Sequence, residues 1–173
     1  MQTITTVLAF DNEAEEAVNL YLSLFAPIFG NSELIKATYF GKEEIEELSK
    51  LPDITADILP GPVGSVKTLR FRLNGQELMA VNGGSYFGKF TESISLYIGC
   101  DTQEQIDKLW EGLSDGGVVQ PCGWVQDRFG VSWQIAPNLV WEIAEGSDLG
   151  RAQRIMKAIY KMKKIDLEMV QQA

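Results

Sequence analysis

The clearest hydrophobic pattern in the chain is a two-residue alternation close to residue 130. In residues 131–136, apolar side chains alternate with Ser132 and Gln134. Successive side chains of a strand point to opposite faces, so the apolar set faces a core and the polar pair faces the other side. The turn sequence Asp-Arg-Phe-Gly comes just before. We therefore predict a hairpin of strands over 123–126 and 131–136, closed by Gly130.

Similar patterns along the rest of the chain predict an α+β fold. Alternation and β-branched runs predict strands, whereas apolar residues at three- and four-residue steps predict helices. The other predicted strands are 3–10, 33–40, 66–73, 77–82, 93–100 and 118–125. The predicted helices are a first one ending near 29, then 103–113, 139–144 and a longer C-terminal helix. The order strand, helix, strand, strand, strand therefore occurs twice.

Capping residues mark where the predicted helices begin. Asp11 or Asn12 is suited to cap the first helix, and Asp101 or Thr102 the helix over 103–113. The apolar face of the last helix, which includes Ile155 and others at helical spacing, requires a partner surface. It packs either on its own chain or on a second subunit.

Length and composition indicate one compact domain. The chain has 173 residues, of which 45% are hydrophobic and 23% charged. No apolar run approaches the roughly 20 residues that span a bilayer, and no basic, apolar leader begins the chain, so we expect a cytoplasmic protein without a membrane partner. Cys100 and Cys122 are expected to be free thiols.

The charge balance argues against nucleic acid as a partner. The formal net charge is −9, which repels nucleic acid and anionic lipid. The distribution is uneven, because residues 1–148 hold nine basic and 22 acidic side chains whereas six basic residues and no acid lie within 149–165. We interpret this basic segment as a solvated helix face that complements an acidic body.

The chain contains no histidine, which restricts its chemistry more than any other feature of composition. Histidine is the commonest general base and the commonest nitrogen ligand of transition metals. Phosphate-binding glycine loops, Cys-x-x-Cys spacings and paired carboxylates suited to acid-base catalysis are also missing from the sequence.

Residues 42–62 form an unusually long connection between two predicted strands. A possible short acidic helix opens it, and the rest is rich in proline. Long connections inside compact domains are either functional lids or mobile insertions, and both alternatives stay open here.

Several motifs together resemble the PhnB-like branch of the vicinal oxygen chelate superfamily, which includes glyoxalase, bleomycin-resistance protein and extradiol dioxygenase. The domain of this branch is called 3-demethylubiquinone-9 3-methyltransferase. The chain departs from the pattern at 41–62, where a shorter loop is expected. The motifs that carry the resemblance are 10–17, 64–66, 82–84, 122–124, the hairpin over 123–136 and 152–154.

The resemblance implies two βαβββ modules that form a curved, mostly antiparallel sheet within a single domain. Module one would occupy about 1–85, module two about 91–137, and a C-terminal helical extension about 138–173. Because proteins of this superfamily commonly pair modules across a dimer, the resemblance also makes a homodimer the preferred assembly. Enzymes of the superfamily hold a divalent metal with His and Glu, but this chain has no histidine, and Gln134 stands where Glu often ends the last strand. We therefore expect no cofactor, and a divalent metal only if carboxylate, amide and thiol groups could hold it.

The candidate ligand-binding residues are polar or aromatic side chains of the predicted strands and turns. Ala80, Asn82, Ser93, Ser95, Tyr97, Ser132 and Gln134 are predicted to face one concavity. The full set of candidates is Arg70, Asn82, Ser95, Tyr97, Cys122, Trp124 and Gln134.

Some of these residues have simpler interpretations. Asn82 could be a turn residue, Trp124 a core residue and Cys122 a small buried hydrophobe. Asp127 and Arg128 are most simply a surface ion pair.

Three functions stay open at the level of the sequence. The first is a metal-free protein that binds a small molecule. The alternative is an enzyme of the lyase, isomerase or dioxygenase type acting on a small oxygenated substrate. A structural dimerisation domain is the third. Methyl transfer has little support, because no strand followed by a glycine-rich loop and a helix appears.

Overall fold

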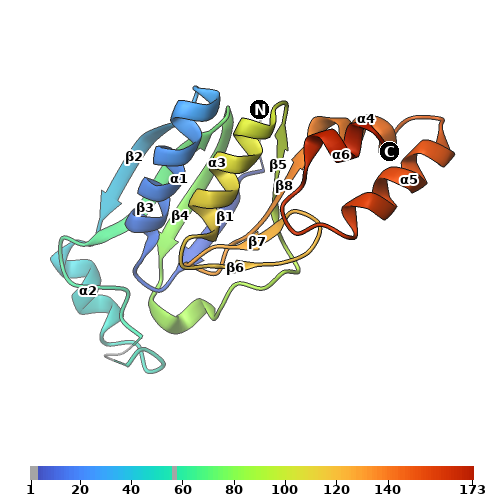
Figure 1. Ribbon diagram of the computed structural model, residues 1–173. Helices are drawn as coiled ribbons and strands as arrows, with labels where there is room; N and C mark the ends of the chain where they lie inside the picture. The colour runs from blue at the N-terminus through green and yellow to red at the C-terminus, as the bar shows by residue number, and fades with distance from the viewer. Residues whose placement is uncertain (1–3, 56–57) are drawn as a thin grey trace. The chain divides into compact units, whose positions relative to one another are not determined.

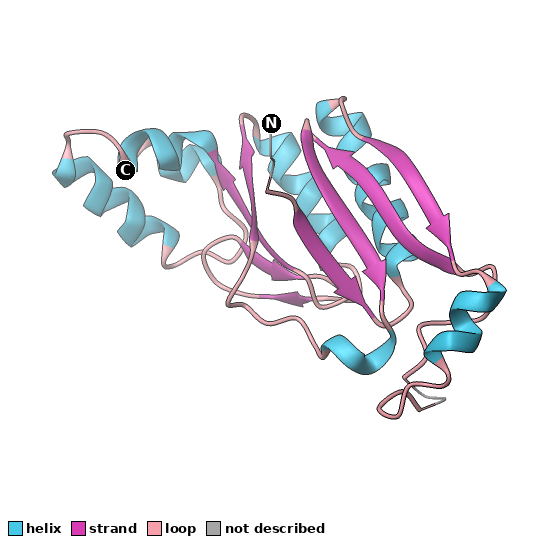
Figure 2. Ribbon diagram, turned by 180° about the vertical axis from the view of Figure 1, so that it is seen from behind, coloured by secondary structure: helices cyan, strands magenta, loops and turns pink. Residues whose placement is uncertain are grey.

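The computed structural model describes residues 4–55 and 58–173, which form two compact units divided after Gly88. Each unit has its own four-stranded sheet (Figures 1 and 2). The first unit corresponds to the predicted module one, and the second unit contains module two and the C-terminal helices.

Module one has the order strand, helix, strand, helix, strand, strand, followed by one 3-10 turn. Strand β1 is parallel to β4, and the two other pairs of the sheet order β1-β4-β3-β2 are antiparallel. Its elements are β1 (Thr6–Phe10), α1 (Ala14–Phe29), β2 (Glu33–Tyr39), α2 (Lys42–Leu48), β3 (Val66–Leu73), β4 (Gln76–Asn82) and η1 (Gly84–Phe87).

Helix α1 covers one face of this sheet, and the opposite face carries no helix within the module (Figure 2). Tyr21 and Phe25 of α1 are buried, as are Phe71 of β3 and Leu78 of β4. The prediction that Asp11 or Asn12 caps this helix is wrong, because α1 begins after Glu13 and has no local side-chain cap.

Module two repeats the strand order as β5-β8-β7-β6, again with one parallel and two antiparallel pairs. Thr102 caps α3 in a capping box with Gln105, so one of the two predicted caps is confirmed. The elements are β5 (Leu96–Cys100), α3 (Gln103–Ser114), β6 (Val118–Val119), β7 (Trp124–Gln126) and β8 (Ser132–Pro137).

Two predicted strands of module two are shorter than expected. The strand predicted over 93–100 begins at Leu96. The strand predicted over 118–125 is divided into β6 and β7 by a turn at Cys122 and Gly123, whose φ angles of 64° and 80° are incompatible with a continuous strand.

Three helices follow the last strand: α4 (Asn138–Ala144), α5 (Leu149–Ile159) and α6 (Leu167–Gln171). The apolar face of α5 packs within its own chain, where Ile155 and Ile159 form a buried cluster with Ile165 and Val170. Of the two alternatives for this face, the structure shows packing on its own chain, so the homodimer prediction now depends on the family resemblance.

The predicted α+β class with two βαβββ modules is confirmed, as is the short helix predicted at the start of residues 42–62. Within the described residues, no helix combines the length and apolar character needed to cross a membrane.

Candidate functional site

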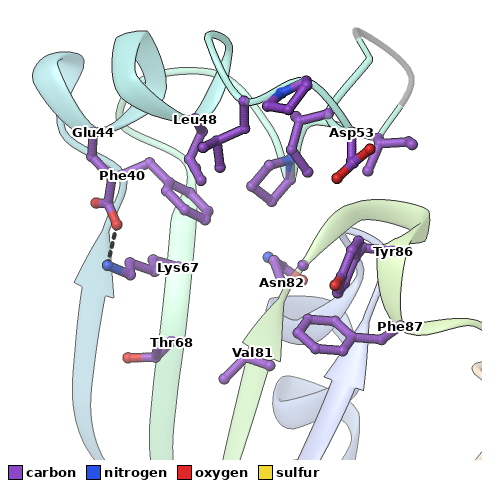
Figure 3. A pocket seen from close by; sticks show the side chains of 16 residues that line it. Phe40, Glu44, Leu48, Asp53, Lys67, Thr68, Val81, Asn82, Tyr86 and Phe87 are labelled. Carbon is purple, nitrogen blue, oxygen red and sulfur yellow. Dashed lines mark hydrogen bonds and ion pairs between the residues drawn. The ribbon is translucent and has the colours of Figure 1, made fainter.

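A cavity of about 540 Å³, called the main cavity below, lies in module one. Its walls come from α2, the segment that follows α2, the adjoining ends of β3 and β4, and η1 (Figure 3). Most of the lining is apolar, and the side chains labelled in Figure 3 include Phe40, Leu48, Val81, Tyr86 and Phe87. The volume and the apolar walls are typical of sites for small organic molecules.

Two glycines allow η1 to approach the floor of this cavity. A Cβ atom on Gly83 would lie 2.1 Å from the ring of Phe87, and one on Gly84 would lie 1.9 Å from the carbonyl oxygen of Ile58. Gly84 also has a φ of 63°, which other residues rarely adopt. The Asn-Gly-Gly sequence after β4 therefore fixes the position of the aromatic pair Tyr86 and Phe87.

A β-bulge directs Lys67 towards the cavity. Thr38 pairs with Thr68 and Tyr39 with Val66, so Lys67 is an extra residue on β3. Its ammonium group forms an ion pair with Glu44 of α2 (Figure 3). The ion pair ties the segment above the cavity to the sheet below it.

Asn82 has a structural role that the sequence did not reveal. Its Oδ1 accepts a hydrogen bond of 2.9 Å from the backbone N–H of Ala14, and its Nδ2 donates one of 2.9 Å to the carbonyl of Val66. Asn82 thus caps α1 from a position 68 residues away. The prediction that Ala80 and Asn82 face the open concavity is wrong, because both are buried on the side of the sheet that α1 covers.

Asn82 nevertheless borders the main cavity and a second, smaller one. The second cavity has a volume of about 310 Å³ and also lies in module one. The oxygen and the nitrogen of the Asn82 side-chain amide already bind backbone atoms, so the side chain has limited capacity to bind a ligand as well.

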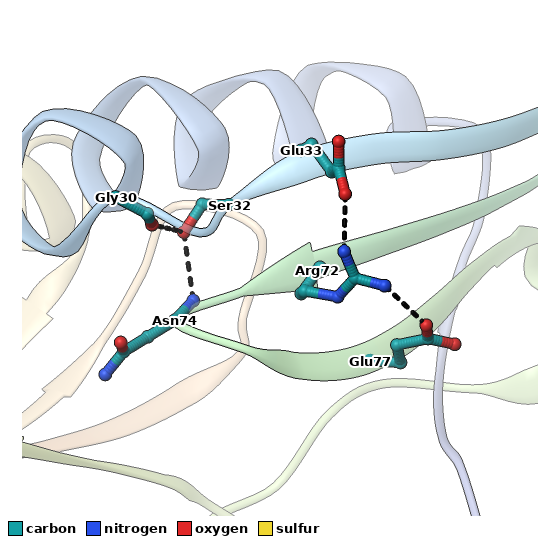
Figure 4. A network of polar contacts seen from close by, with 6 residues as sticks. All are labelled: Gly30, Ser32, Glu33, Arg72, Asn74 and Glu77. Atoms are coloured by element: carbon teal, nitrogen blue, oxygen red, sulfur yellow. Dashed lines mark hydrogen bonds and ion pairs between the residues drawn. The ribbon is translucent and has the colours of Figure 1, made fainter.

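The two arginines of β3 differ in their surroundings. Arg72 of the inner strand β3 forms ion pairs with Glu33 of β2 and, at 2.8 Å, with Glu77 of β4, which fix it in a polar network across three strands (Figure 4). The predicted ligand clamp Arg70 is exposed, and it lines neither of the two cavities.

Four of the predicted residues do come together on the sheet of module two. The Nε2 of Gln134 donates a hydrogen bond of 2.7 Å to the hydroxyl of Ser95. In the ladder, Tyr97 of β5 and Trp124 of β7 are both paired with Gln134 of β8. The ring of Tyr97 also packs edge-on against Trp141 of α4, with 5.2 Å between the centroids.

The Tyr97 hydroxyl on this face is not suited to acid-base chemistry at neutral pH. The Tyr97 hydroxyl and the Ser132 hydroxyl are buried, and neither has a hydrogen-bond partner in the described parts of the chain. Burial raises the pKa of Tyr97 to about 12, with a smaller contribution from Cys100. Burial likewise raises the pKa of Cys100 to about 12.

Cys122 does not join this polar face. It packs against the buried cluster of the C-terminal helices, and its backbone N–H donates a 2.8 Å hydrogen bond to the carbonyl of Met162. The neighbouring Gly123 makes an equivalent bond to Lys163. The Cys122 thiol therefore belongs to the junction between the sheet and the C-terminal helices.

Asp127 is not the surface ion-pair residue that the turn sequence suggested. The residue is 3% exposed, and its Oδ2 accepts a 2.8 Å hydrogen bond from the indole N–H of Trp133. Its Oδ1 accepts hydrogen bonds from the backbone N–H groups of Phe129 and Val131. Arg128 pairs with Asp115 instead.

The described residues do not form a metal site of the usual kind. Within residues 4–55 and 58–173, no three Asp, Glu or Cys side chains are grouped so that they could hold a metal ion. The donor groups of these residues thus offer no fit for a divalent metal bound by several side chains.

The cavity walls were largely missed by sequence reasoning. Apart from Asn82, none of the predicted ligand-binding residues lines the main cavity. One signal was available: the long connection at 42–62 carries several apolar side chains, and an aromatic pair follows the Asn-Gly-Gly sequence.

The paired βαβββ modules define a member of the vicinal oxygen chelate superfamily. The family model for 3-demethylubiquinone-9 3-methyltransferase matches residues 2–136, and the chain belongs to this PhnB-like family. No curated protein matches the chain.

One solved structure supports this assignment, and a second has a similar fold. The PhnB protein from Bacillus cereus, which carries the same family description, is 33% identical, with 78% of this chain and 98% of that chain covered and a TM-score of 0.60. Protein PA1353 from Pseudomonas aeruginosa is 20% identical, with 79% and 98% covered and a TM-score of 0.55. Helices α4 to α6 lie beyond the part that the family model matches.

Proposed function

We propose that this chain binds a small organic molecule in the module-one cavity and that binding needs no metal. The observation that carries the proposal is a cavity of about 540 Å³ whose walls are mainly apolar. Such a space favours an apolar molecule, because each Å² of apolar surface removed from water contributes about 25 cal/mol.

The segment over the cavity supports this proposal. Residues 42–62, one of whose predicted roles is a lid, contribute Leu48, Ile54 and Ile58 to the lining. The ion pair between Glu44 and Lys67 is partly exposed on both sides, so its contribution to closure is small, at about 0.2–1 kcal/mol. A weakly held cover allows a ligand to enter and leave.

A matched pair of variants tests the proposal. The neutral fluorescent probe N-phenyl-1-naphthylamine is titrated against the wild type, Leu48→Asp and Ser49→Asp. Leu48 lines the cavity and Ser49, its neighbour on the same helix end, does not. A carboxylate inside the cavity must be desolvated by an apolar ligand, so Leu48→Asp should weaken binding at least about tenfold while Ser49→Asp should not.

Two results would contradict the proposal. One is the lack of any saturable binding by the wild type, and the other is equal affinity of the two variants. Circular dichroism of both variants checks that the fold is retained.

The alternative function is an enzyme that acts on a small oxygenated substrate at the polar face of module two. The observation that favours it is the pair of buried hydroxyl groups of Tyr97 and Ser132, which have no hydrogen-bond partner among the described residues. The raised pKa of Tyr97 argues against proton transfer by that group at neutral pH, which is why the binding function is preferred.

Elemental analysis separates the two functions. Tag-free protein is exposed to manganese, iron, nickel and zinc, and loosely bound ions are removed. We expect no retained metal. Close to one metal ion per chain would favour the enzyme, with oxygen and sulfur ligands in place of histidine.

A homodimer in the cytoplasm, with no nucleic-acid partner, completes the proposal. The family resemblance supports the dimer, and the apolar face of α5 does not, because that face is covered within the chain. The net charge of −9 argues against a nucleic-acid partner. Light scattering at micromolar concentration tests the dimer, and a monomer would remove it.

A further inference from the structure

We infer that the ligand of the main cavity carries a positive charge beside an apolar, aromatic body. This inference rests on the proposed function, because it names the class of ligand for the same cavity. Its basis is the balance of charges and aromatic rings along the walls.

Three charged side chains line the cavity: Glu44, Asp53 and Lys67. Glu44 and Lys67 neutralise each other through their ion pair. Asp53 forms no ion pair or hydrogen bond with another side chain in the described parts of the chain. Among the described residues, the Asp53 carboxylate is therefore the one lining charge without a counter-charge.

Two aromatic side chains near Asp53 also favour a positively charged ligand. Figure 3 shows Asp53 on the side of the cavity where Tyr86 and Phe87 lie, away from the Glu44–Lys67 pair. The two rings pack edge-to-face, with 5.4 Å between their centroids. The face of an aromatic ring attracts cations, so the rings and the carboxylate favour the same sign of charge.

An anionic ligand has no comparable partner. Lys67, the one cation among the described lining residues, is engaged by Glu44 and also lies over the ring of Phe40, at 5.9 Å from its centroid. The net charge of −9 further lowers the local concentration of anions and raises that of cations. An organic amine or quaternary ammonium compound with aromatic rings fits these conditions.

Three fluorescent probes of different charge test the inference. Thioflavin T is cationic, N-phenyl-1-naphthylamine is neutral and 1-anilinonaphthalene-8-sulfonate is anionic. They are titrated at an ionic strength of about 20 mM, where charges are weakly screened. The wild type should bind the cation most tightly and the anion most weakly.

Asp53→Asn isolates the contribution of the carboxylate. Because Asp53 is exposed to solvent, we expect a loss of about two- to fivefold in affinity for thioflavin T and no change for the neutral probe. Glu43→Gln is the matched control. It also removes one negative charge, but Glu43 lies on α2 and does not line the cavity. It should change neither affinity.

The outcomes separate the two levels of the proposal. If the neutral probe binds but thioflavin T has the same affinity for the wild type and Asp53→Asn, the inference is overturned and the binding function stands. An equal loss in Asp53→Asn and Glu43→Gln also overturns it, because only net charge would then matter. If none of the probes binds to the wild type, the binding function itself fails.

Discussion

The two modules share a strand order but present different chemistry. Both sheets place the first strand of the module parallel to the fourth, and helix α1 or α3 follows that first strand. In module one, a long connection encloses an apolar cavity. In module two, the strands are shorter and polar side chains gather on the sheet. The comparison shows that the shared topology leaves the character of a site to connections and to individual strand positions.

The strand registers make the comparison specific. Met79 of β4 is paired with Val7 of β1 and Arg70 of β3. At the corresponding place in module two, Gln134 is paired with Tyr97 and Trp124. The same position of the fold thus carries aliphatic and charged groups in one module and amide and aromatic groups in the other.

The modules also differ in how their hairpins are closed, and this difference predicts the largest effect. The β3–β4 turn contains Asn74 and Gly75, which have φ angles of 45° and 85°. The turn before β8 is fixed by the buried Asp127, which accepts hydrogen bonds from Trp133 and two backbone N–H groups. Asp127→Ala should lower the free energy of unfolding by about 3–4 kcal/mol, whereas Asn74→Ala should cost about 1 kcal/mol.

Urea unfolding of both variants measures this difference. Asp127→Asn keeps the size of the side chain and an acceptor, so it should retain part of the stability lost in Asp127→Ala. A cost of less than about 1 kcal/mol for Asp127→Ala would mean that Asp127 contributes no more than a surface ion pair does. The two hairpin turns would then not differ in how they are stabilised.

The starts of the two helices provide a second contrast of intermediate size. Helix α1 is capped by the distant, buried Asn82, whereas α3 is capped locally by Thr102. Asn82→Ala removes a cap and leaves the carbonyl of Val66 without this donor, so it should cost about 2–3 kcal/mol. Thr102→Ala removes an exposed cap and should cost about 1 kcal/mol.

Hydrogen exchange locates these two effects. The first-turn amides of α1 should lose protection in Asn82→Ala, and those of α3 should lose protection in Thr102→Ala. Equal costs for the two substitutions would mean that burial of the Asn82 amide adds nothing to its role as a cap.

Periodicity predicted most of the fold because strand and helix patterns are local. The two-residue alternation around Gln134 and the turn at Asn74 fixed two hairpins correctly. The long-range cap by Asn82 could not be predicted, because the partner amide lies 68 residues away and both Asp11 and Asn12 are good local caps. The break at Cys122 was missed because its positive φ depends on backbone bonds to the C-terminal segment.

The candidate site was predicted only in part for a similar reason. Alternation placed Ser95, Tyr97 and Gln134 on one face, and the structure brings these three residues together. Every second residue of a strand points to the same face, so such a grouping can be predicted from local sequence. The cavity depends on how an irregular segment folds over β3 and β4, and on the bulge that turns Lys67 towards it. Neither feature has a repeating pattern in sequence.

The smallest predicted effect concerns Tyr97, whose counterpart in module one is Val7, a residue without a hydroxyl. Because the Tyr97 hydroxyl is buried without a partner in the described residues, Tyr97→Phe should change the free energy of unfolding by less than about 0.5 kcal/mol near neutral pH. A cost above about 1 kcal/mol would show that the hydroxyl makes a hydrogen bond, and the contrast with Val7 would then involve a specific polar contact.

The pH dependence of the same variant tests the cause. The pKa of Tyr97 is about 12 in the folded chain against 10.0 for a free tyrosine, so both states are protonated below pH 10.0. Between these values the unfolded chain loses the proton first, and stability must fall as pH rises. Urea unfolding at pH about 8 and about 11 should show a smaller decrease for Tyr97→Phe than for the wild type, while the decrease caused by Cys100 persists in both. Equal decreases would mean that Tyr97 ionises as readily in the fold as in water.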